Sequence, residues 1–263
     1  MKIVSKDRWA LILGGSSGLG LATGKKLAQH GYNLLILYRD RRVDLEKIMI
    51  DFQEITAMGV QLKTFNTDAL NAQKRGSLIQ EMQSFLGSSQ QIKVLVHSIS
   101  KGSLKPMNSK QDIELKNADF QITIDAMALS LYDWTKALVN AKLFDPDTRI
   151  ISFTSEGNTK SWKNYGAVSV AKVALEALTR SIALEFASEG IKANCIQAGV
   201  TETKSFSMIP GSDKIKENAL RRNPNNRLTT PEDVANVVYL LSSDEAKWIT
   251  GTVIKVDGGE SLM

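Results

Sequence analysis

Residues 10–20 read ALILGGSSGLG, an apolar run of strand length that leads directly into a glycine-rich turn. A helix is expected to follow the turn. Such a connection lets backbone amides approach a pyrophosphate at the positive end of the helix dipole. The glycines at positions 14, 18 and 20 have a spacing that differs from the common G-x-G-x-x-G dinucleotide motif. The stretch therefore predicts a dinucleotide phosphate site, with a merely tight connection as the simpler alternative.

Apolar runs of strand length alternate with longer helical stretches along the whole chain. Several runs are apolar at successive positions, as expected for strands buried on both faces of a parallel sheet. This alternation predicts an α/β fold, a doubly wound parallel sheet with helices on both faces. The strands are expected at Ala10–Leu13, Leu34–Tyr38, Leu62–Phe65, Val94–Val96, Ile150–Phe153, Ala193–Ile196 and Val253–Val256. No repeat or linker interrupts the pattern, so residues 1–263 are expected to form a single domain.

The second half of the chain contains two clear helix signals and one irregular segment. One helix face is formed by Leu175, Leu178, Ile182 and Phe186. Thr230 followed by Pro231 predicts the start of another helix, with Thr230 as its N-cap. The segment 202–228 contains two prolines and four asparagines, and we predict a mobile loop with short helices there.

The composition argues against several classes of protein. The chain has 263 residues, of which 43% are hydrophobic and 23% charged, and these values are typical of a globular protein. A net charge of +5 without an aromatic-basic motif predicts no nucleic-acid partner. One cysteine, Cys195, excludes an intramolecular disulfide, and with only two histidines we expect no metal site. No apolar run reaches the length of a membrane span, so we expect a cytoplasmic protein without a membrane partner.

The residues after the second and third strands bear on the choice of dinucleotide. Arg39 follows the second strand directly, and an arginine there favours a ribose 2′-phosphate, hence NADPH over NADH. Asp40 beside it is the kind of residue that favours a free 2′-hydroxyl, and the pair is alternatively a surface charge cluster. Asp68, after the third strand, is placed either to accept from an adenine amino group or to cap the next helix.

Taken together, these residues resemble the short-chain dehydrogenase/reductase family from about residue 7 to residue 260. The resemblance rests on the glycine turn, Asp68, the strand 94–96 with the turn His97-Ser98-Ile99-Ser100, Lys172, Asn194, Ala198-Gly199 with Thr203, and Asp257-Gly258-Gly259. It implies a single-domain, Rossmann-type fold and a nicotinamide cofactor.

One spacing indicates the branch of the family. The commonest members carry a catalytic tyrosine four residues before the lysine, where this chain has Val168. Tyr165 lies seven residues before Lys172, which resembles the enoyl-[acyl-carrier-protein] reductase branch. Because Ser155 retains the family's serine, the chain is most similar to the NADPH-dependent enoyl reductase III type. Two positions depart from the family pattern: Asp125 replaces an asparagine of the proton relay, and Ser17 replaces a basic residue of NADPH-specific relatives.

The resemblance assigns roles to individual residues. Tyr165, Lys172 and Ser155 are the implied catalytic residues. The implied cofactor contacts are Gly14, Ser16, Ser17, Gly18, Leu19, Gly20, Arg39, Asp68, Ala69, Ser98, Ile99, Ser100, Lys172, Ala198, Gly199, Thr201 and Thr203.

The resemblance also implies partners. It implies a homotetramer or a dimer, built on the stretches 112–140 and 165–188, and an acyl-carrier protein bearing the enoyl chain. In that picture the segment 202–228 is a substrate lid, and its basic residues steer the acidic carrier: Lys204, Lys214, Lys216, Arg221, Arg222 and Arg227.

The spacing of Tyr165 and Lys172 also has a chemical meaning. Seven residues are about 10.5 Å along a helix and close to two turns, so both side chains share one face. A tyrosine displaced in this way suits enoyl thioester reduction, because hydride goes to the β-carbon while charge develops on the thioester oxygen. Two alternatives stay open: a 3-oxoacyl or other carbonyl reductase of the same family, and an NADPH-sensing protein without turnover. His97 and Cys195 are interpreted as structural residues.

Overall fold

A computed structural model of the chain describes residues 8–110 and 113–263. All seven predicted strands form, and they are β1 Arg8–Leu13, β2 Asn33–Tyr38, β3 Leu62–Asn66, β4 Gln91–His97, β5 Phe144–Ser155, β6 Ile191–Ala198 and β7 Val253–Val256. They make one sheet in the order β3-β2-β1-β4-β5-β6-β7, and every neighbouring pair is parallel. The predicted doubly wound α/β fold is confirmed.

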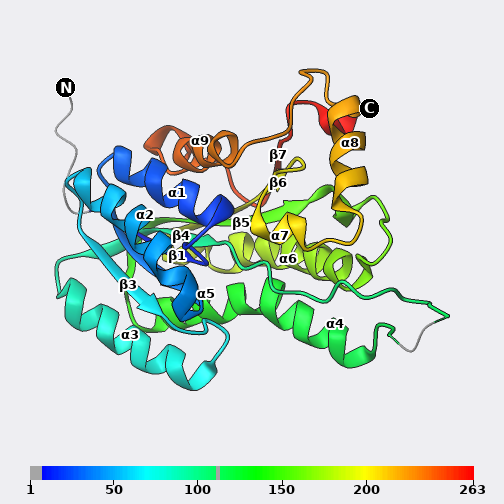
Figure 1. Cartoon of the computed structure of the whole chain (residues 1–263). Coiled ribbons are helices and arrows are strands. Elements are labelled where there is room, and N and C mark those ends of the chain that lie inside the picture. The colour runs from blue at the N-terminus through cyan, green and yellow to red at the C-terminus, as the bar shows by residue number, and fades with distance from the viewer. Residues whose placement is uncertain (1–7, 111–112) are drawn as a thin grey trace.

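Helices cover both faces of this sheet (Figure 1). They are α1 Gly18–Gln29, α2 Leu45–Ala57, α3 Ala72–Leu86, α4 Asn117–Ile124, α5 Ser130–Asn140, α6 Gly166–Glu185, α7 Lys204–Ser207, α8 Ser212–Arg222 and α9 Pro231–Leu241. A π-helical turn at residues 125–129 joins α4 to α5. The stretch expected to begin at residue 112 becomes helical at Asn117, and residues 111 and 112 lie outside the described residues.

The alternation of side chains along β1 shows how the two layers are held. Trp9, Leu11 and Leu13 pack with α3, α5 and α6 in one apolar cluster. Ala10 and Ile12 pack with α1, α2 and α9 in a second cluster on the opposite face. Because both faces of the central strands are buried, these strands read as continuous apolar runs in the sequence.

Local signals set the helix ends close to the site. Thr230 accepts a hydrogen bond from the Asp233 N–H at 3.2 Å, while the Asp233 carboxylate accepts from the Thr230 N–H at 2.9 Å. This capping box, with Pro231 in the first turn, starts α9 as predicted. The segment 202–228 contains two short helices, α7 and α8, as expected.

The strand order creates a crevice for a ligand. β1 lies between β2 and β4, so the connections after β1 and β4 leave the sheet in opposite directions. Ligands of open α/β sheets bind at such a switch point, outside the carboxyl ends of the strands. Over residues 8–110 and 113–263, no helix is long and apolar enough to cross a membrane.

Candidate active site

The predicted site residues meet along the carboxyl edge of the sheet, because parallel strands all end there. Gly14 follows β1, Arg39 follows β2, and Asp68 comes shortly after β3. On the other side of the switch point, Ser98 follows β4 and Ser155 ends β5. Residues from distant parts of the sequence thus come to one edge.

The glycine turn after β1 has the geometry of a phosphate cradle. Gly14 and Gly18 have φ angles of +87° and +53°, which L side chains rarely adopt. A Cβ at Gly20 would lie 2.1 Å from the Gly14 carbonyl oxygen. α1 begins at Gly18, so its first-turn amides face the turn without intrahelical partners. The chain's own atoms therefore fit a dinucleotide pyrophosphate at this place.

Two carboxylates lie after β2 and β3, where the sequence predicts the adenosine part of the cofactor. The Ser16 hydroxyl donates to Asp40 at 2.6 Å. Arg39 donates to Asp68 at 2.5 Å, in a pair whose arginine is exposed. Burial disfavours the charged form of Asp68, but hydrogen bonds from the Leu70 N–H and Arg39 outweigh it and hold the pKa of Asp68 below its usual value.

The alternative role of Asp68 as a helix cap is wrong. Its carboxylate accepts from the Leu70 N–H at 3.0 Å, within the connection that precedes α3. α3 is capped by Asn71, whose side chain accepts from the Lys74 N–H at 3.0 Å. The contact of Asp68 with an adenine amino group stays a prediction.

The structure places the Tyr165 and Ser155 hydroxyls beside each other, and it places Lys172 against the β5 main chain. The hydroxyls of Tyr165 and Ser155 lie 3.3 Å apart, at the start of α6 and the end of β5. The Lys172 ammonium donates to the Phe153 carbonyl oxygen at 2.7 Å. A Cβ at Gly157 would lie 2.5 Å from the Tyr165 ring, so the glycine makes room for the ring. All three predicted catalytic side chains belong to one corner of the carboxyl edge.

Burial dominates the electrostatics of this corner. It raises the pKa of Tyr165, against a smaller lowering by the Ser155 hydrogen bond. It also lowers the pKa of Lys172. Burial, and after it the charge of Lys172, lowers the pKa of His97. Burial raises the pKa of Cys195 against smaller opposing effects of the Ser152 hydrogen bond and the charge of Lys172. Acidification of Tyr165 by Lys172 stays a prediction for the cofactor-bound site.

An apolar wall surrounds Tyr165, and the sequence reasoning did not anticipate it. Tyr165, Met127, Val168 and Ala171 form one buried cluster, and partly buried hydrophobic side chains pack against it: Leu104, Ile124, Trp162 and Ile209. The rings of Trp162 and Tyr165 have centroids 5.1 Å apart. Trp162, Tyr165, Val168 and Ala171 follow one another at intervals of three residues, whereas Leu104, Met127 and Ile209 come from separate segments that no spacing links to them. These side chains give the Tyr165 ring an apolar surrounding.

His97 has the contacts expected of a structural residue, and its hydrogen-bond partner is a side chain. Its Nε2 lies 2.7 Å from the Ser130 hydroxyl. That hydroxyl donates its own proton to the Ala126 carbonyl oxygen at 2.8 Å, so we assign the proton of this contact to Nε2 of His97. Burial and then the charge of Lys172 lower the pKa of His97 to about 3, so the ring is neutral and unsuited as an acid.

Asp125, the departure from the family's relay, lies away from the buried hydroxyls. It is exposed in the π-helical turn and accepts from Gln121 at 2.8 Å. Cys195 lies in the core, where burial raises its pKa to about 11, as expected of a structural thiol. Among the described residues, no group of three or more His, Cys, Asp or Glu side chains could hold a metal ion.

The start of the segment 202–228, which we call the lid segment, lies against the glycine turn. A Cβ at Gly18 would lie 3.3 Å from the Thr203 methyl group. The hydroxyls of Ser205 and Ser100 are 2.7 Å apart. Lid residues thus contact two of the loops that form the cofactor crevice.

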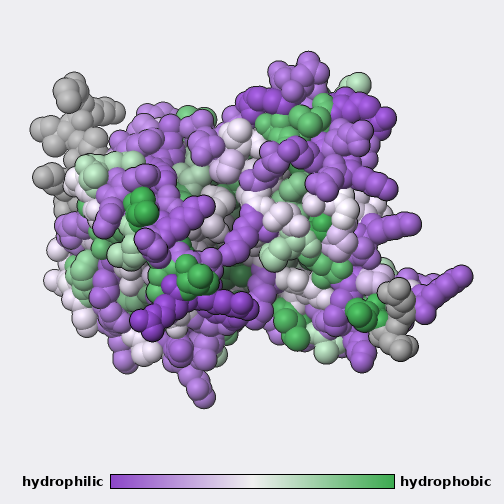
Figure 2. Space-filling view, viewed as in Figure 1, coloured by the Kyte–Doolittle hydropathy of each residue, from purple (hydrophilic) through white to green (hydrophobic). Residues whose placement is uncertain are grey.

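Acids of this chain neutralise most of the basic residues predicted to steer a partner. The ion pairs are Lys204 with Asp44, Lys216 with Glu202, Arg222 with Glu156 and Glu260, and Arg227 with Asp233. Hydrophilic side chains cover the corner of the surface that α8 occupies, at the upper right of Figure 2. The charge available for steering is therefore smaller than the sequence suggests.

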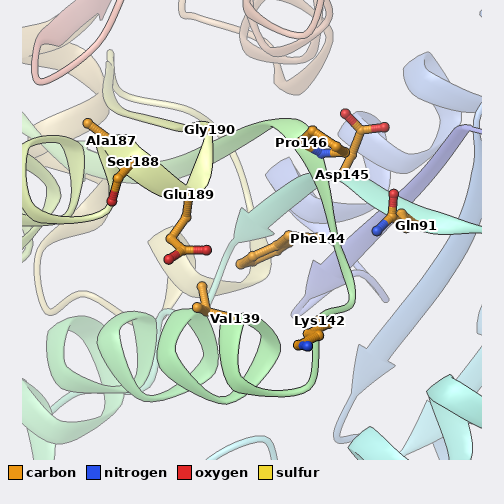
Figure 3. Close-up of a pocket in the computed structure, with 10 residues that line it drawn as sticks. All are labelled: Gln91, Val139, Lys142, Phe144, Asp145, Pro146, Ala187, Ser188, Glu189 and Gly190. Carbon is orange, nitrogen blue, oxygen red and sulfur yellow. The ribbon is translucent and has the colours of Figure 1, made fainter.

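A separate pocket of about 410 Å³ lies at the opposite, amino edge of the sheet (Figure 3). Its lining comes from the end of α5, the starts of β4 and β5 and the connection after α6. It includes Phe144, Lys142 and Glu189, and none of the predicted site residues.

Comparisons with known proteins agree with this geometry. A family model described as enoyl-(acyl carrier protein) reductase matches residues 14–261. The chain is 28% identical over 255 residues to a 3-oxoacyl-[acyl-carrier-protein] reductase of Staphylococcus epidermidis, covering 96% of this chain and 98% of the relative. It is 27% identical over 263 residues to a (2S)-[(R)-hydroxy(phenyl)methyl]succinyl-CoA dehydrogenase subunit of Thauera aromatica, covering 98% of each.

Solved structures show the same fold. The crystal structure of an enoyl-[acyl-carrier-protein] reductase (NADH) from Aquifex aeolicus superposes with a TM-score of 0.82 at 26% identity, covering 97% of each chain. An enoyl reductase from Anaplasma phagocytophilum in complex with NAD also has a TM-score of 0.82, at 20% identity, covering 100% of this chain and 95% of that one.

Proposed function

This chain belongs to the short-chain dehydrogenase/reductase family, and we propose that it reduces trans-2-enoyl-[acyl-carrier-protein] thioesters with NADPH in fatty acid elongation. The observation that carries the proposal is the buried Tyr165 hydroxyl, 3.3 Å from Ser155 and two helical turns before Lys172. The apolar wall around Tyr165 supports an acyl chain as the group that lies beside it.

The roles of the residues follow from their places. NADPH, when bound, supplies the hydride for the β-carbon. Tyr165 donates a hydrogen bond to the thioester oxygen as negative charge develops on it, and Ser155 supports the same hydroxyl. Removing a donor of this kind costs roughly 3–4 kcal/mol of transition-state stabilisation. Lys172, already fixed by the Phe153 carbonyl, binds the ribose hydroxyls.

The cradle after β1 holds the pyrophosphate, and its neighbours set the choice of cofactor. Arg39 is exposed, and an exposed ion pair such as Arg39–Asp68 is worth only about 0–1 kcal/mol, so a 2′-phosphate can displace it. Asp40, held by Ser16, opposes a second negative charge nearby. We favour NADPH, and Arg39→Ala should then weaken NADPH binding while changing NADH binding little.

A 3-oxoacyl reductase is the second candidate function. It is favoured by the retained Ser155–Tyr165 pair and by the relative from Staphylococcus epidermidis that carries that name. The two functions differ in the atom that needs the acid: a carbonyl reductase protonates the oxygen on the carbon that receives the hydride. The displacement of Tyr165 relative to Lys172 favours the enoyl substrate.

The first experiment is cofactor oxidation, followed by absorbance, with crotonyl and longer trans-2-enoyl thioesters beside acetoacetyl thioester. Oxidation with enoyl substrates alone supports the proposal, oxidation with the 3-oxo substrate alone replaces it with the second candidate, and binding without oxidation favours a sensor. Tyr165→Phe should lower kcat by about 10²–10³-fold while NADPH still binds. The matched control is Tyr132→Phe on α5, which removes a hydroxyl that accepts from Lys136. Normal turnover by the Tyr165 variant would contradict the assignment.

We also propose an acyl-carrier protein as the macromolecular partner and a homotetramer or dimer as the assembly. If the basic lid residues steer the carrier, KM for carrier-bound substrate should rise with salt, whereas KM for a coenzyme A thioester should change less. Equal salt responses would remove the steering role.

A further inference from the structure

One arginine ties the lid segment to the strand end that carries the catalytic serine. Arg222, the last residue of α8, donates to both oxygens of Glu156, at 3.2 and 2.9 Å. Glu156 follows Ser155 directly in the chain, and only 7% of it is exposed. A bidentate pair of this kind fixes orientation as well as distance. The end of α8 is therefore aligned with the Ser155 main chain.

The same guanidinium reaches a second buried carboxylate. Arg222 also donates to Oε1 of Glu260 at 2.8 Å, and only 2% of Glu260 is exposed. Figure 1 shows α8 beside the C-terminal segment that carries Glu260. The other oxygen of Glu260 accepts from the Val200 N–H at 3.0 Å. Residues 200 and 222, which flank the first part of the lid segment, thus meet at one carboxylate.

Two cations contact the two carboxylates of this cluster, and Asp257 adds a negative charge nearby. Burial outweighs the Val200 N–H and Arg222 at Glu260 and raises the pKa of that carboxyl. Lys160 pairs with Glu156 at 2.6 Å. Burial disfavours charge on Glu156, but Arg222 and Lys160 outweigh it and keep the pKa of Glu156 below its usual value. Removing one partner of a buried pair is strongly unfavourable, because an uncompensated charge stays behind. The cluster is therefore a firm connection.

The free part of the lid segment lies over the site. Between the pinned ends, Thr203 contacts the glycine turn, Ser205 contacts Ser100, and Ile209 packs against the Tyr165 cluster. A shift of the pinned base would move all three contacts. The position of the base consequently controls how the apolar wall closes beside Tyr165.

We propose that Arg222, Glu156 and Glu260 form a clamp that closes the base of the lid segment and holds it in register with Ser155. The three are positioning residues, since they act through Ser155, Val200 and Ile209 and not on the substrate. This inference rests on the proposed function for its effect on turnover. Its effect on the lid segment itself is independent of which substrate is reduced.

The test compares Arg222→Met and Glu260→Gln with Asn218→Ala, an exposed substitution one turn earlier on α8. Amide hydrogen exchange of residues 202–221 should be about tenfold faster or more in both clamp variants, and unchanged in the control. KM for the thioester should rise more than kcat falls. Arg222→Lys keeps the charge but cannot make the bidentate hydrogen bonds of a guanidinium, so it should recover part of the protection of residues 202–221 against hydrogen exchange.

The outcomes separate the clamp from the proposed function. Faster exchange in the clamp variants supports the clamp, even where no tested thioester is reduced. Exchange of residues 202–221 at the parental rate in Glu260→Gln overturns it, even where enoyl reduction is confirmed. Should Arg222→Met fail to fold, Glu260→Gln carries the test, because the glutamine oxygen still accepts from the Val200 N–H.

Discussion

Replacing His97 by glutamine should reduce the loss of stability that the protein suffers in mild acid. His97 is buried at the end of β4 with a pKa of about 3, whereas an unfolded histidine titrates near 6.5. Below pH 6.5 the unfolded chain binds a proton at this residue, whereas the folded chain does not. The free energy of unfolding is therefore unaffected above 6.5 and falls as the pH drops from 6.5 toward 3.

The magnitude follows from the shift. Each pH unit in that window removes about 1.4 kcal/mol, so His97 alone costs about 2 kcal/mol at about pH 5. Glutamine takes up no proton, and its amide can still donate to the Ser130 hydroxyl. Between pH 7 and about pH 5, the variant should thus lose about 2 kcal/mol less than the parent.

Urea unfolding at the two pH values measures this difference. The control is His30→Gln: this ring is less buried, stacks on Tyr239 with centroids 3.5 Å apart, and has a pKa lowered by burial and Lys26. His30→Gln should also reduce the slope of the free energy of unfolding against pH, but by less than His97→Gln does. A parental slope in the His97 variant, or titration of His97 near its ordinary pKa, would refute the reasoning.

Three further substitutions test the cradle, an open position in α3 and a helix cap. Gly20→Ala should lower NADPH affinity about tenfold or more and lower Tm, because its Cβ meets the Gly14 carbonyl oxygen. Gly76→Ala in α3, where a Cβ meets open space, should instead raise the free energy of unfolding by about 0.5–1 kcal/mol. Cofactor titration and thermal melting distinguish the two variants. Equal effects of both substitutions would contradict the clash at Gly20. Thr230→Ala removes half of the capping box with Asp233 and should cost about 1 kcal/mol in urea unfolding, and an unchanged midpoint would show that the box contributes nothing.

The sequence alone was sufficient for the sheet and the glycine turn, and it predicted one helix face for Tyr165 and Lys172. Strands buried on both faces carry continuous apolar runs, so all seven were visible, and their parallel direction brings their ends to one edge. The glycine turn was visible because positive φ angles and close backbone approach restrict the residue type. Tyr165 and Lys172 were linked because a helix converts a spacing of seven into a shared face.

Only the tertiary structure decided which side chains pair across that edge. Asp68 was open to two roles until Asn71 was seen to cap α3. Arg222 looked like one more exposed base, yet its partners lie 66 and 38 residues away in the chain. Contacts at such separations leave no local pattern, because they depend on how loops from different strands meet. The contacts of Met127 and Ile209 with the helix face of Tyr165 and the clamp beneath the lid segment arise in this way, and the periodicity of a single helix or strand carries no information about them.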